Sequence, residues 1–229
     1  MSESLQGQVA LITGGSTELA GAIALTLAEA GVRVSLCGRQ ADALELSVKK
    51  IKAAGRDGLG IESGLGSEGE AEHVLSQVLA AYGRIDILIL VSPFWAGGQI
   101  HAHAVRTWDL VLEANVREPF LMARAALPVF RAQRHGEVLG VASDSALGIY
   151  PMDGAYAVAM HGLKALMELI RVENAEFGVR THLLAPGVAQ TMERDAEGTP
   201  VLTAGHVAEW ALWLLTRPAH LRGNGPILI

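Results

Sequence analysis

The feature that most constrains the fold is a regular alternation of short β-rich runs with longer stretches of helical periodicity. Runs typical of buried strands occur at 9–13, 32–37, 57–62, 85–91, 136–142, 179–185 and 226–229. Helical segments separate them at 19–30, 40–54, 68–82, 105–133, 153–176 and 206–217. Parallel strands need a crossover connection, usually a helix, so this order predicts βαβ units. We therefore expect a doubly wound α/β fold, with about seven parallel strands and helices on both faces.

The composition suits one domain with a large core. Of the 229 residues, 50% are hydrophobic and 18% are charged, so residues 1–229 are expected to form a single globular domain. The helical segment 105–133 is expected to break where Pro119 follows Glu118, because the residue before a proline disfavours helical backbone. The polar stretch 190–205 suits a surface flap better than a linker.

Charge and hydropathy argue against several kinds of partner. The formal net charge is −6, so we expect no basic face for nucleic acid or anionic lipid. No apolar run reaches the roughly 18 residues of a membrane span, and the first residues do not resemble a signal peptide, so a cytoplasmic protein is expected. Cys37, the single cysteine, lies in an apolar run, which predicts a buried strand residue rather than a nucleophile. No metal site is predicted.

A glycine-containing turn follows the first predicted strand and opens a helical pattern, TGGSTELAGAIALTLAEAG. Free backbone N–H groups and the helix dipole bind phosphate at such a helix start. This turn, with Thr13, Gly14, Ser16 and Thr17, is therefore the predicted position of a dinucleotide. Strand, turn and helix together resemble the start of a short-chain dehydrogenase/reductase, a family with a Rossmann-like fold.

Two residues depart from that family's turn, which reads TGxxxGxG. Glu18 and Ala20 stand at its two later glycine positions. Ala20 is a mild departure, because this glycine serves helix packing. A carboxylate at Glu18 brings bulk and negative charge toward the pyrophosphate, although an acid at a helix start also favours the helix dipole. The sequence leaves open whether Glu18 points to solvent or reduces the affinity for a cofactor.

At the adenosine end of the cofactor site, the sequence matches the family's motifs only in part. Arg39, after the second predicted strand, is placed to pair with a ribose 2′-phosphate, and no nearby acid is present to bind a 2′-hydroxyl. This favours NADP if a nucleotide binds; an exposed arginine that opens a helix is the alternative. The family's NNAG segment is replaced by LVSP at 90–93, and Gly64 stands where an acid commonly follows the third strand.

At the nicotinamide end of the site, the sequence matches the family's motif more closely. The stretch APGVAQT at 185–191 resembles the family's PGxxxT segment. The resemblance implies that Thr191 hydrogen-bonds the nicotinamide carboxamide and phosphates, and it places Pro186 and Gly187 at the cofactor.

Three positions match the family's catalytic group: Asn115, Ser143 and Tyr156, with Tyr156 thirteen residues after Ser143. The resemblance implies that Ser143 orients and polarises a substrate carbonyl and that Tyr156 exchanges a proton with its oxygen. It also implies that Asn115 holds a water in a proton relay. Each residue alone has an ordinary structural explanation, but all three together with PGxxxT make coincidence improbable.

The lysine that assists the tyrosine in this family is missing. A residue four positions later lies one helical turn above the tyrosine, and Met160 occupies that place. Lys164 is about 12 Å along the axis and His161 points about 140° away, so neither replaces it. His101 and His103 would reach the site only if their loop folds over it. Without a nearby cation a phenol keeps a pKa near about 10 and stays protonated, which favours carbonyl reduction over alcohol oxidation.

These observations predict an NADPH-dependent reductase of a small carbonyl, with Phe94, Trp95 and Tyr150 lining part of its pocket. The alternative is a family member that kept the fold for assembly or ligand sensing, which Glu18, the missing NNAG and Met160 favour. Halohydrin dehalogenases share the fold, but their arginine at the Met160 position and their halide nest are absent here.

The resemblance also implies a homo-dimer or homo-tetramer that associates through the long helices at 105–133 and 153–176. The second of these carries an apolar stripe at Val158, Leu163, Leu166, Met167 and Ile170. Periodicity does not separate an interface from a core for this stripe.

Overall fold

The structure, a computed structural model, describes residues 4–187, 202–217 and 226–228. Its one sheet has the strand order β3-β2-β1-β4-β5-β6-β7, and each neighbouring pair is parallel. The strands are β1 (Val9–Ile12), β2 (Arg33–Gly38), β3 (Gly58–Glu62), β4 (Ile87–Val91), β5 (Gly136–Val141), β6 (Val179–Ala185) and β7 (Pro226–Leu228). The predicted doubly wound parallel sheet is confirmed: six main strands form it, and β7 adds a short edge strand of three residues.

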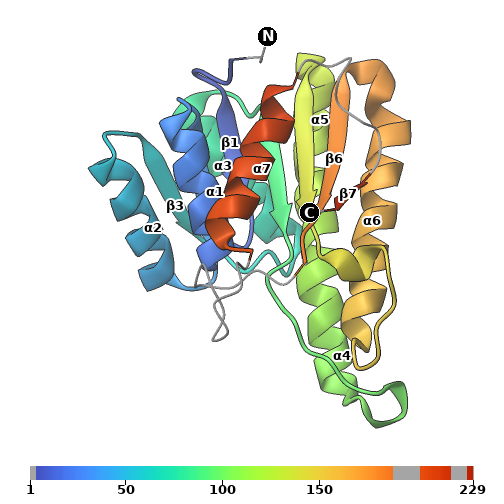
Figure 1. Cartoon of the computed structure of the whole chain (residues 1–229). Coiled ribbons are helices and arrows are strands. Elements are labelled where there is room, and N and C mark those ends of the chain that lie inside the picture. Colours follow the sequence, from blue (N-terminus) through green and yellow to red (C-terminus); the bar gives the residue numbers. More distant parts are fainter. Residues whose placement is uncertain (1–3, 188–201, 218–225, 229) are drawn as a thin grey trace.

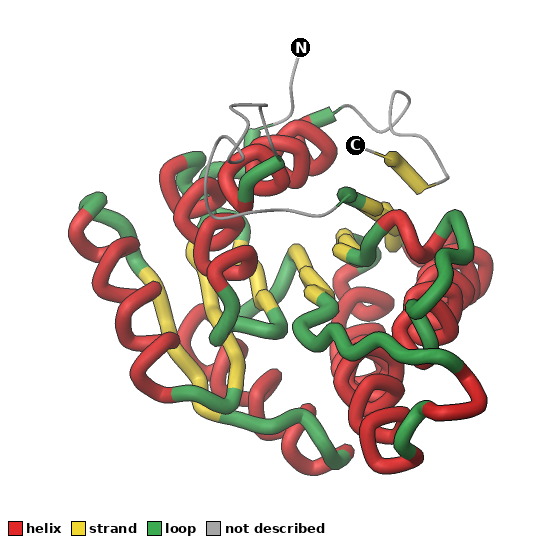
Figure 2. The backbone as a smooth tube through the Cα atoms, turned by 60° about the horizontal axis from the view of Figure 1, so that its bottom comes forward, coloured by secondary structure: helices red, strands yellow, loops and turns green. Residues whose placement is uncertain are grey.

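Helices cover both faces of the sheet (Figures 1 and 2). The helices are α1 (Glu18–Glu29), α2 (Ala41–Ala53), α3 (Glu68–Tyr82), α4 (Val105–Leu112), α5 (Glu118–Gln133), α6 (Ala155–Asn174) and α7 (Ala204–Thr216). Short turns of other helix types are η1 (Ile100–Ala102), η2 (Glu113–Arg117), η3 (Asp144–Ala146) and η4 (Ala175–Phe177). Buried side chains of α1, α2 and α7 form the core on one face, and those of α3, α5 and α6 form the core on the other.

The central strands are buried on both faces, which explains why the sequence reads there as continuous apolar runs. Every residue of β1, β4 and β5 is buried. In the register of the sheet, Ile12 of β1 aligns with Leu36 of β2 and with Ile89 of β4. The strand order reverses between β1 and β4. Doubly wound sheets bind ligands at this switch point, beyond the carboxyl ends of the strands.

The predicted break before Pro119 is wrong in its reason: Glu118 keeps right-handed helical backbone, with φ −61° and ψ −46°, although a residue before proline usually disfavours it. The type of helix changes there instead. A π-helical turn, η2, joins α4 to α5, and the Glu118 N–H bonds to the Glu113 carbonyl five residues earlier. Pro119 has no N–H, so the Asn115 carbonyl cannot receive the bond that residue i+4 normally donates. This change of helix type places the buried Asn115 in the π-helical turn.

Beyond the carboxyl edge of the sheet, α4 and the loop before it project from the body of the domain (Figure 1). Among the described residues, no helix combines the length and apolar character needed to cross a membrane. The same residues contain no group of three or more His, Cys, Asp or Glu side chains arranged to hold a metal ion.

Candidate active site

A cavity of about 280 Å³ opens at the carboxyl edge of the sheet. Its wall comes from the turn after β1, the end of β2, the loops after β3 and β4, and one side of α4, η2 and α5. Four residues predicted to bind the cofactor line it: Gly14, Ser16, Thr17 and Arg39. The structure therefore brings together residues from two separate strand–helix turns at the switch point.

Thr13, also predicted at the cofactor, has a different position. It is buried, and its hydroxyl accepts from the Val91 N–H at 3.1 Å and donates to the Ile89 carbonyl at 3.4 Å. Both partners belong to β4, so Thr13 fixes the end of β1 to β4 beneath the turn.

The turn after β1 needs its glycines for two reasons. Gly14 has φ 65°, a conformation that side chains disfavour. A Cβ on Gly15 would lie 2.8 Å from the Leu44 side chain and 2.9 Å from the Cys37 carbonyl. Thr17 then caps α1: its hydroxyl accepts from the Ala20 N–H at 3.2 Å. The turn thus directs a helix N-terminus at the cavity, which suits a phosphate.

Glu18 is the first residue of α1 and is exposed. The described residues that line the cavity do not include it. This geometry favours the interpretation that the side chain points to solvent and interacts with the helix dipole.

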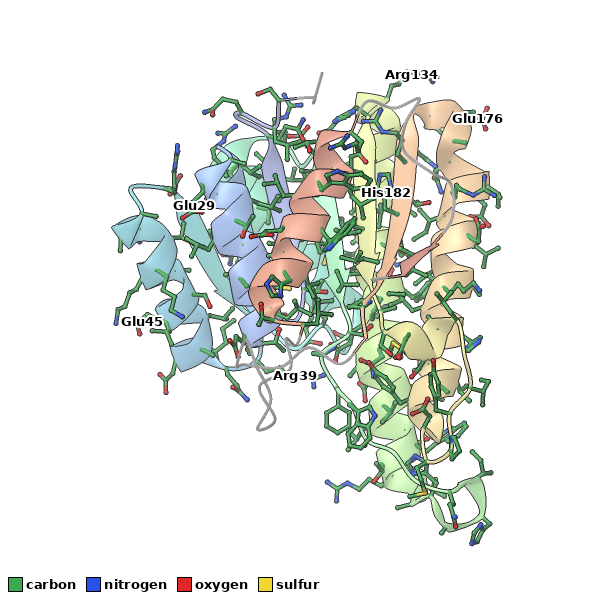
Figure 3. The ribbon with its side chains drawn as sticks, in the orientation of Figure 1. Glu29, Arg39, Glu45, Arg134, Glu176 and His182 are labelled. Atoms are coloured by element: carbon green, nitrogen blue, oxygen red, sulfur yellow. The ribbon has the colours of Figure 1, made fainter. Side chains whose placement is uncertain are left out.

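Arg39 already has a partner in the protein. Its guanidinium forms an ion pair with Glu118 of α5 and donates to the Gly64 carbonyl at 3.3 Å. The Arg39 side chain is 57% exposed, whereas that of Glu118 is 11% exposed. Burial raises the pKa of Glu118 to about 7; the Arg39 charge opposes this rise, and Glu113 and Glu70 add to it. Figure 3 shows Arg39 below the carboxyl ends of the strands.

Asn115 fixes the loop after β4, where the NNAG segment is missing. Its side-chain oxygen accepts from the Phe94 N–H at 3.2 Å, and its side-chain nitrogen donates to the Phe94 carbonyl at 2.6 Å. Both hydrogen bonds go to one backbone residue, so Asn115 clamps this loop to η2. Pro93 and Phe94 of the clamped loop line the cavity.

Ser143 and Tyr156 are brought together although thirteen residues separate them. Ser143 follows β5 and begins η3, with its hydroxyl accepting from the Ser145 N–H at 3.0 Å. Tyr156 lies in the first turn of α6, beside Ser143, whose hydroxyl acts to lower the pKa of the phenol. The Ser143 hydroxyl also donates to the Asp144 carboxylate at 3.2 Å. The turn η2, which carries Asn115, packs against α6.

Burial raises the pKa of the Tyr156 phenol above its ordinary value of 10. The Ser143 hydroxyl opposes this rise, and the carboxylates of Asp144 and Asp153 add to it. Asp153 in turn accepts from the Ser145 hydroxyl at 2.9 Å. The phenol is therefore a proton donor at neutral pH, and its neighbourhood is acidic.

Met160 points into the core. It is fully buried in the apolar cluster that α5 and α6 share with the sheet. The His161 ring lies 3.0 Å from the Ala157 carbonyl of its own helix. His103 packs edge-on against Trp108, and a Cβ on Gly154 would lie 2.5 Å from its ring. The loop after β4 therefore folds against the start of α6, and His103 contacts α6 there.

The PG segment lies beside η3. The Pro186 carbonyl accepts from the Asp144 N–H at 3.0 Å, so Pro186 and Gly187 are adjacent to the turn that carries Ser143. Thr191 lies outside the described residues.

Glu118 is the residue of this site that sequence analysis missed. Its place before Pro119 indicated only a helix break. The spacing along the helix could have indicated it: Leu110, Ala114 and Glu118 are four residues apart, which places them on one helix face, and all three line the cavity. Cys37, which also lines it, is buried as predicted, and burial raises the pKa of its thiol to about 12.

Fold and site together define a dinucleotide-binding oxidoreductase of the doubly wound class. The chain matches the family model for short chain dehydrogenases over residues 8–199. The protein belongs to the short-chain dehydrogenase family, whose members are NAD(P)-dependent oxidoreductases that act on small molecules.

Proteins similar in sequence and structure agree with this class. An uncharacterized oxidoreductase of Staphylococcus haemolyticus is 29% identical over 224 residues, 96% of each chain. Dehydrogenase/reductase SDR family member 4 of Bos taurus is 30% identical over 190 residues, which is 82% of this chain and 67% of that protein. A solved metagenomic short-chain oxidoreductase in complex with NADP is 28% identical, with a TM-score of 0.85 over 99% of this chain and 98% of that one. A short-chain dehydrogenase/reductase from Burkholderia xenovorans is 25% identical, with a TM-score of 0.90 over 99% and 96%.

Proposed function

We propose that the protein uses NADPH to reduce a small carbonyl compound to an alcohol. The observation that carries the proposal is the placement of Ser143 beside the Tyr156 phenol at the carboxyl edge of the sheet. The same edge carries the cavity lined by the turn after β1 and by Arg39. A structural neighbour in complex with NADP supports the choice of nucleotide.

The chain's own residues suit a dinucleotide at this cavity. The Gly14–Gly15 turn leaves space that a side chain would fill, and Ser16 and Thr17 lead into the N-terminus of α1. These residues would hold the phosphates, and Arg39 would hold a 2′-phosphate. When bound, the cofactor supplies a hydride to the carbonyl carbon.

Ser143 and Tyr156 act at the carbonyl oxygen. The Ser143 hydroxyl donates a hydrogen bond that orients and polarises the carbonyl, and the Tyr156 phenol donates the proton that completes the alcohol. Pro119 leaves the Asn115 carbonyl without its usual helical donor, and in our proposal this carbonyl holds a water that resupplies the proton. The exposed aromatic side chains of Trp95 and Tyr150 would contact the substrate, whereas Phe94 lines the nucleotide cavity.

The raised pKa of Tyr156 gives the reaction a preferred direction. A donor must be protonated, and the phenol stays protonated until the pH rises through its folded pKa, above 10. Alcohol oxidation needs the phenolate, which is scarce at neutral pH. Reduction is therefore expected to be insensitive to this group from pH 6 to 9, roughly the neutral range.

Nucleotide binding provides the first test. Fluorescence titration of nucleotide-free protein with NADPH and NADH should show saturable binding, tighter for NADPH. Arg39→Ala should weaken NADPH binding and leave NADH binding unchanged, because only NADPH carries the 2′-phosphate. The matched control is Arg56→Ala, a change outside the cavity wall. If neither nucleotide binds at millimolar concentration, the reductase proposal is wrong and the chain is a retained scaffold.

We also propose assembly into dimers or tetramers through α5 and α6. Exposed apolar side chains on these helices include Phe120, Leu169 and Val172. Within the apolar stripe of α6, whose role the sequence left open, Leu163, Met167 and Ile170 are buried in the core, whereas Val158 is exposed. Sedimentation of the wild-type protein and of Leu169→Glu tests this assembly, which the variant should shift toward monomer.

A further inference from the structure

The cation expected to recognise a 2′-phosphate is bound across the cavity by an acid. The same Arg39 nitrogen donates to the Glu118 carboxylate and to the Gly64 carbonyl. Arg39 comes from the end of β2 and Glu118 from the start of α5, 79 residues apart in sequence, and both line the cavity. The ion pair therefore connects two sides of the predicted adenosine site.

The surroundings of Glu118 are acidic. From the loop and helix after β3, Glu70 faces Gly64: its carboxylate lies 3.3 Å from where a Gly64 Cβ would be. Glu113 of η2 adds a second carboxylate, itself 3.9 Å from Arg117. Cys37 of β2 is neutral, because its thiol pKa is raised to about 12. Arg39 is thus the cation that the structure pairs with Glu118.

We propose that Glu118 competes with the 2′-phosphate of the nucleotide for Arg39 and so sets how strongly the site prefers NADPH over NADH. The inference rests on the proposed function, because it concerns the same nucleotide site. NADH has no 2′-phosphate and leaves the ion pair intact. NADPH must either share the guanidinium with Glu118 or displace it.

Displacement has a physical consequence. A carboxylate with a side-chain exposure of 11% is poorly solvated, and losing its cation leaves a buried charge unpaired. Burial already raises the pKa of Glu118 to about 7 against the attraction of Arg39. Removing that attraction raises the pKa further, so Glu118 takes up a proton as the phosphate takes Arg39. NADPH binding at pH 8 should then be coupled to proton uptake.

The test compares wild type, Glu118→Gln, Arg39→Ala and the double variant by calorimetry at pH 8 with NADPH and NADH. The amide of Glu118→Gln keeps the shape and one acceptor oxygen but removes the negative charge that holds the guanidinium. It should strengthen NADPH binding on the order of tenfold and leave NADH binding unchanged. In the Arg39→Ala background the same substitution should have much less effect, because the competition passes through Arg39. Glu113→Gln is the matched control, since Glu113 is paired with Arg117 instead.

Proton uptake gives an independent readout. Titrations in buffers of different ionisation enthalpy should show uptake on NADPH binding by wild type, none by Glu118→Gln, and none on NADH binding. Adenosine 2′,5′-bisphosphate and adenosine 5′-monophosphate repeat the comparison without the nicotinamide. NADPH binding that is neither strengthened by Glu118→Gln nor coupled to protons would overturn the inference while leaving the reductase proposal intact. Absence of nucleotide binding by every variant would instead refute the proposed function.

Discussion

At the scale of single residues, the proposal depends most on the Tyr156 phenol. Tyr156→Phe removes the proton donor and keeps the ring, so carbonyl reduction should fall about 100-fold or more while NADPH affinity stays the same. Tyr82→Phe, on α3 and away from Ser143, is the matched control and should keep full activity. Steady-state kinetics with a panel of small ketones and aldehydes measures both. Equal activity of wild type and Tyr156→Phe would show that another group supplies the proton.

A second prediction concerns Met160 and the stability of the fold rather than catalysis. The family's lysine is absent, but introducing it at this position should be costly, because the Met160 side chain is fully buried in the apolar core. Met160→Lys should lower the free energy of unfolding by about 2 kcal/mol or more, since an ammonium is costly there. Met152→Lys, at a residue that is 55% exposed, should change it little. Urea unfolding of the two variants decides; an unchanged midpoint for Met160→Lys would mean that the ammonium reaches a polar partner.

At the scale of elements, η2 holds the loop after β4 through one side chain. Asn115→Ala leaves both the Phe94 N–H and its carbonyl without their partner. We expect a loss of roughly 1–3 kcal/mol in the free energy of unfolding, together with faster hydrogen exchange at the Phe94 amide. Asn115→Asp keeps one acceptor and should recover part of the loss. Unchanged exchange at Phe94 in Asn115→Ala would contradict the clamp.

The elements differ in how far sequence predicted them. Buried strands such as β4 could be predicted from the sequence, because a parallel sheet covered on both faces requires continuous apolar runs. An interruption near Pro119 was also predicted, but not its form, because Glu118 keeps helical backbone and only the hydrogen-bond pattern changes. The pairing of Arg39 with Glu118 was not, because the two residues belong to different crossovers and only the packing of α5 against the cavity joins them. Sequence spacing reports neighbours on one helix, but it carries little information about contacts between helices.

At the scale of the whole molecule, two buried groups give the stability opposite dependences on pH. Burial raises the pKa of Glu118 from 4.5 to about 7, so the folded chain binds more protons than the unfolded chain in this window and stability falls as pH rises. Burial, with the Arg180 charge, lowers the pKa of His182 from 6.5 to about 4. The folded chain then binds fewer protons, and stability rises with pH. Glu118 is paired with Arg39, which Figure 3 shows well apart from His182, so the two contributions should add.

The two slopes overlap between pH 4.5 and 6.5, where they should largely cancel in the wild-type protein. Glu118→Gln removes one of them. Relative to wild type, its free energy of unfolding should therefore rise by roughly 2–3 kcal/mol across this window, at about 1.4 kcal/mol per pH unit. His182→Gln should show the opposite trend, and Glu176→Gln, at an exposed carboxylate, should follow wild type. Urea unfolding at several pH values measures these differences. Parallel curves for wild type and Glu118→Gln would show that Glu118 is ionised throughout, and the carboxylate would then hold Arg39 just as firmly at acidic as at neutral pH.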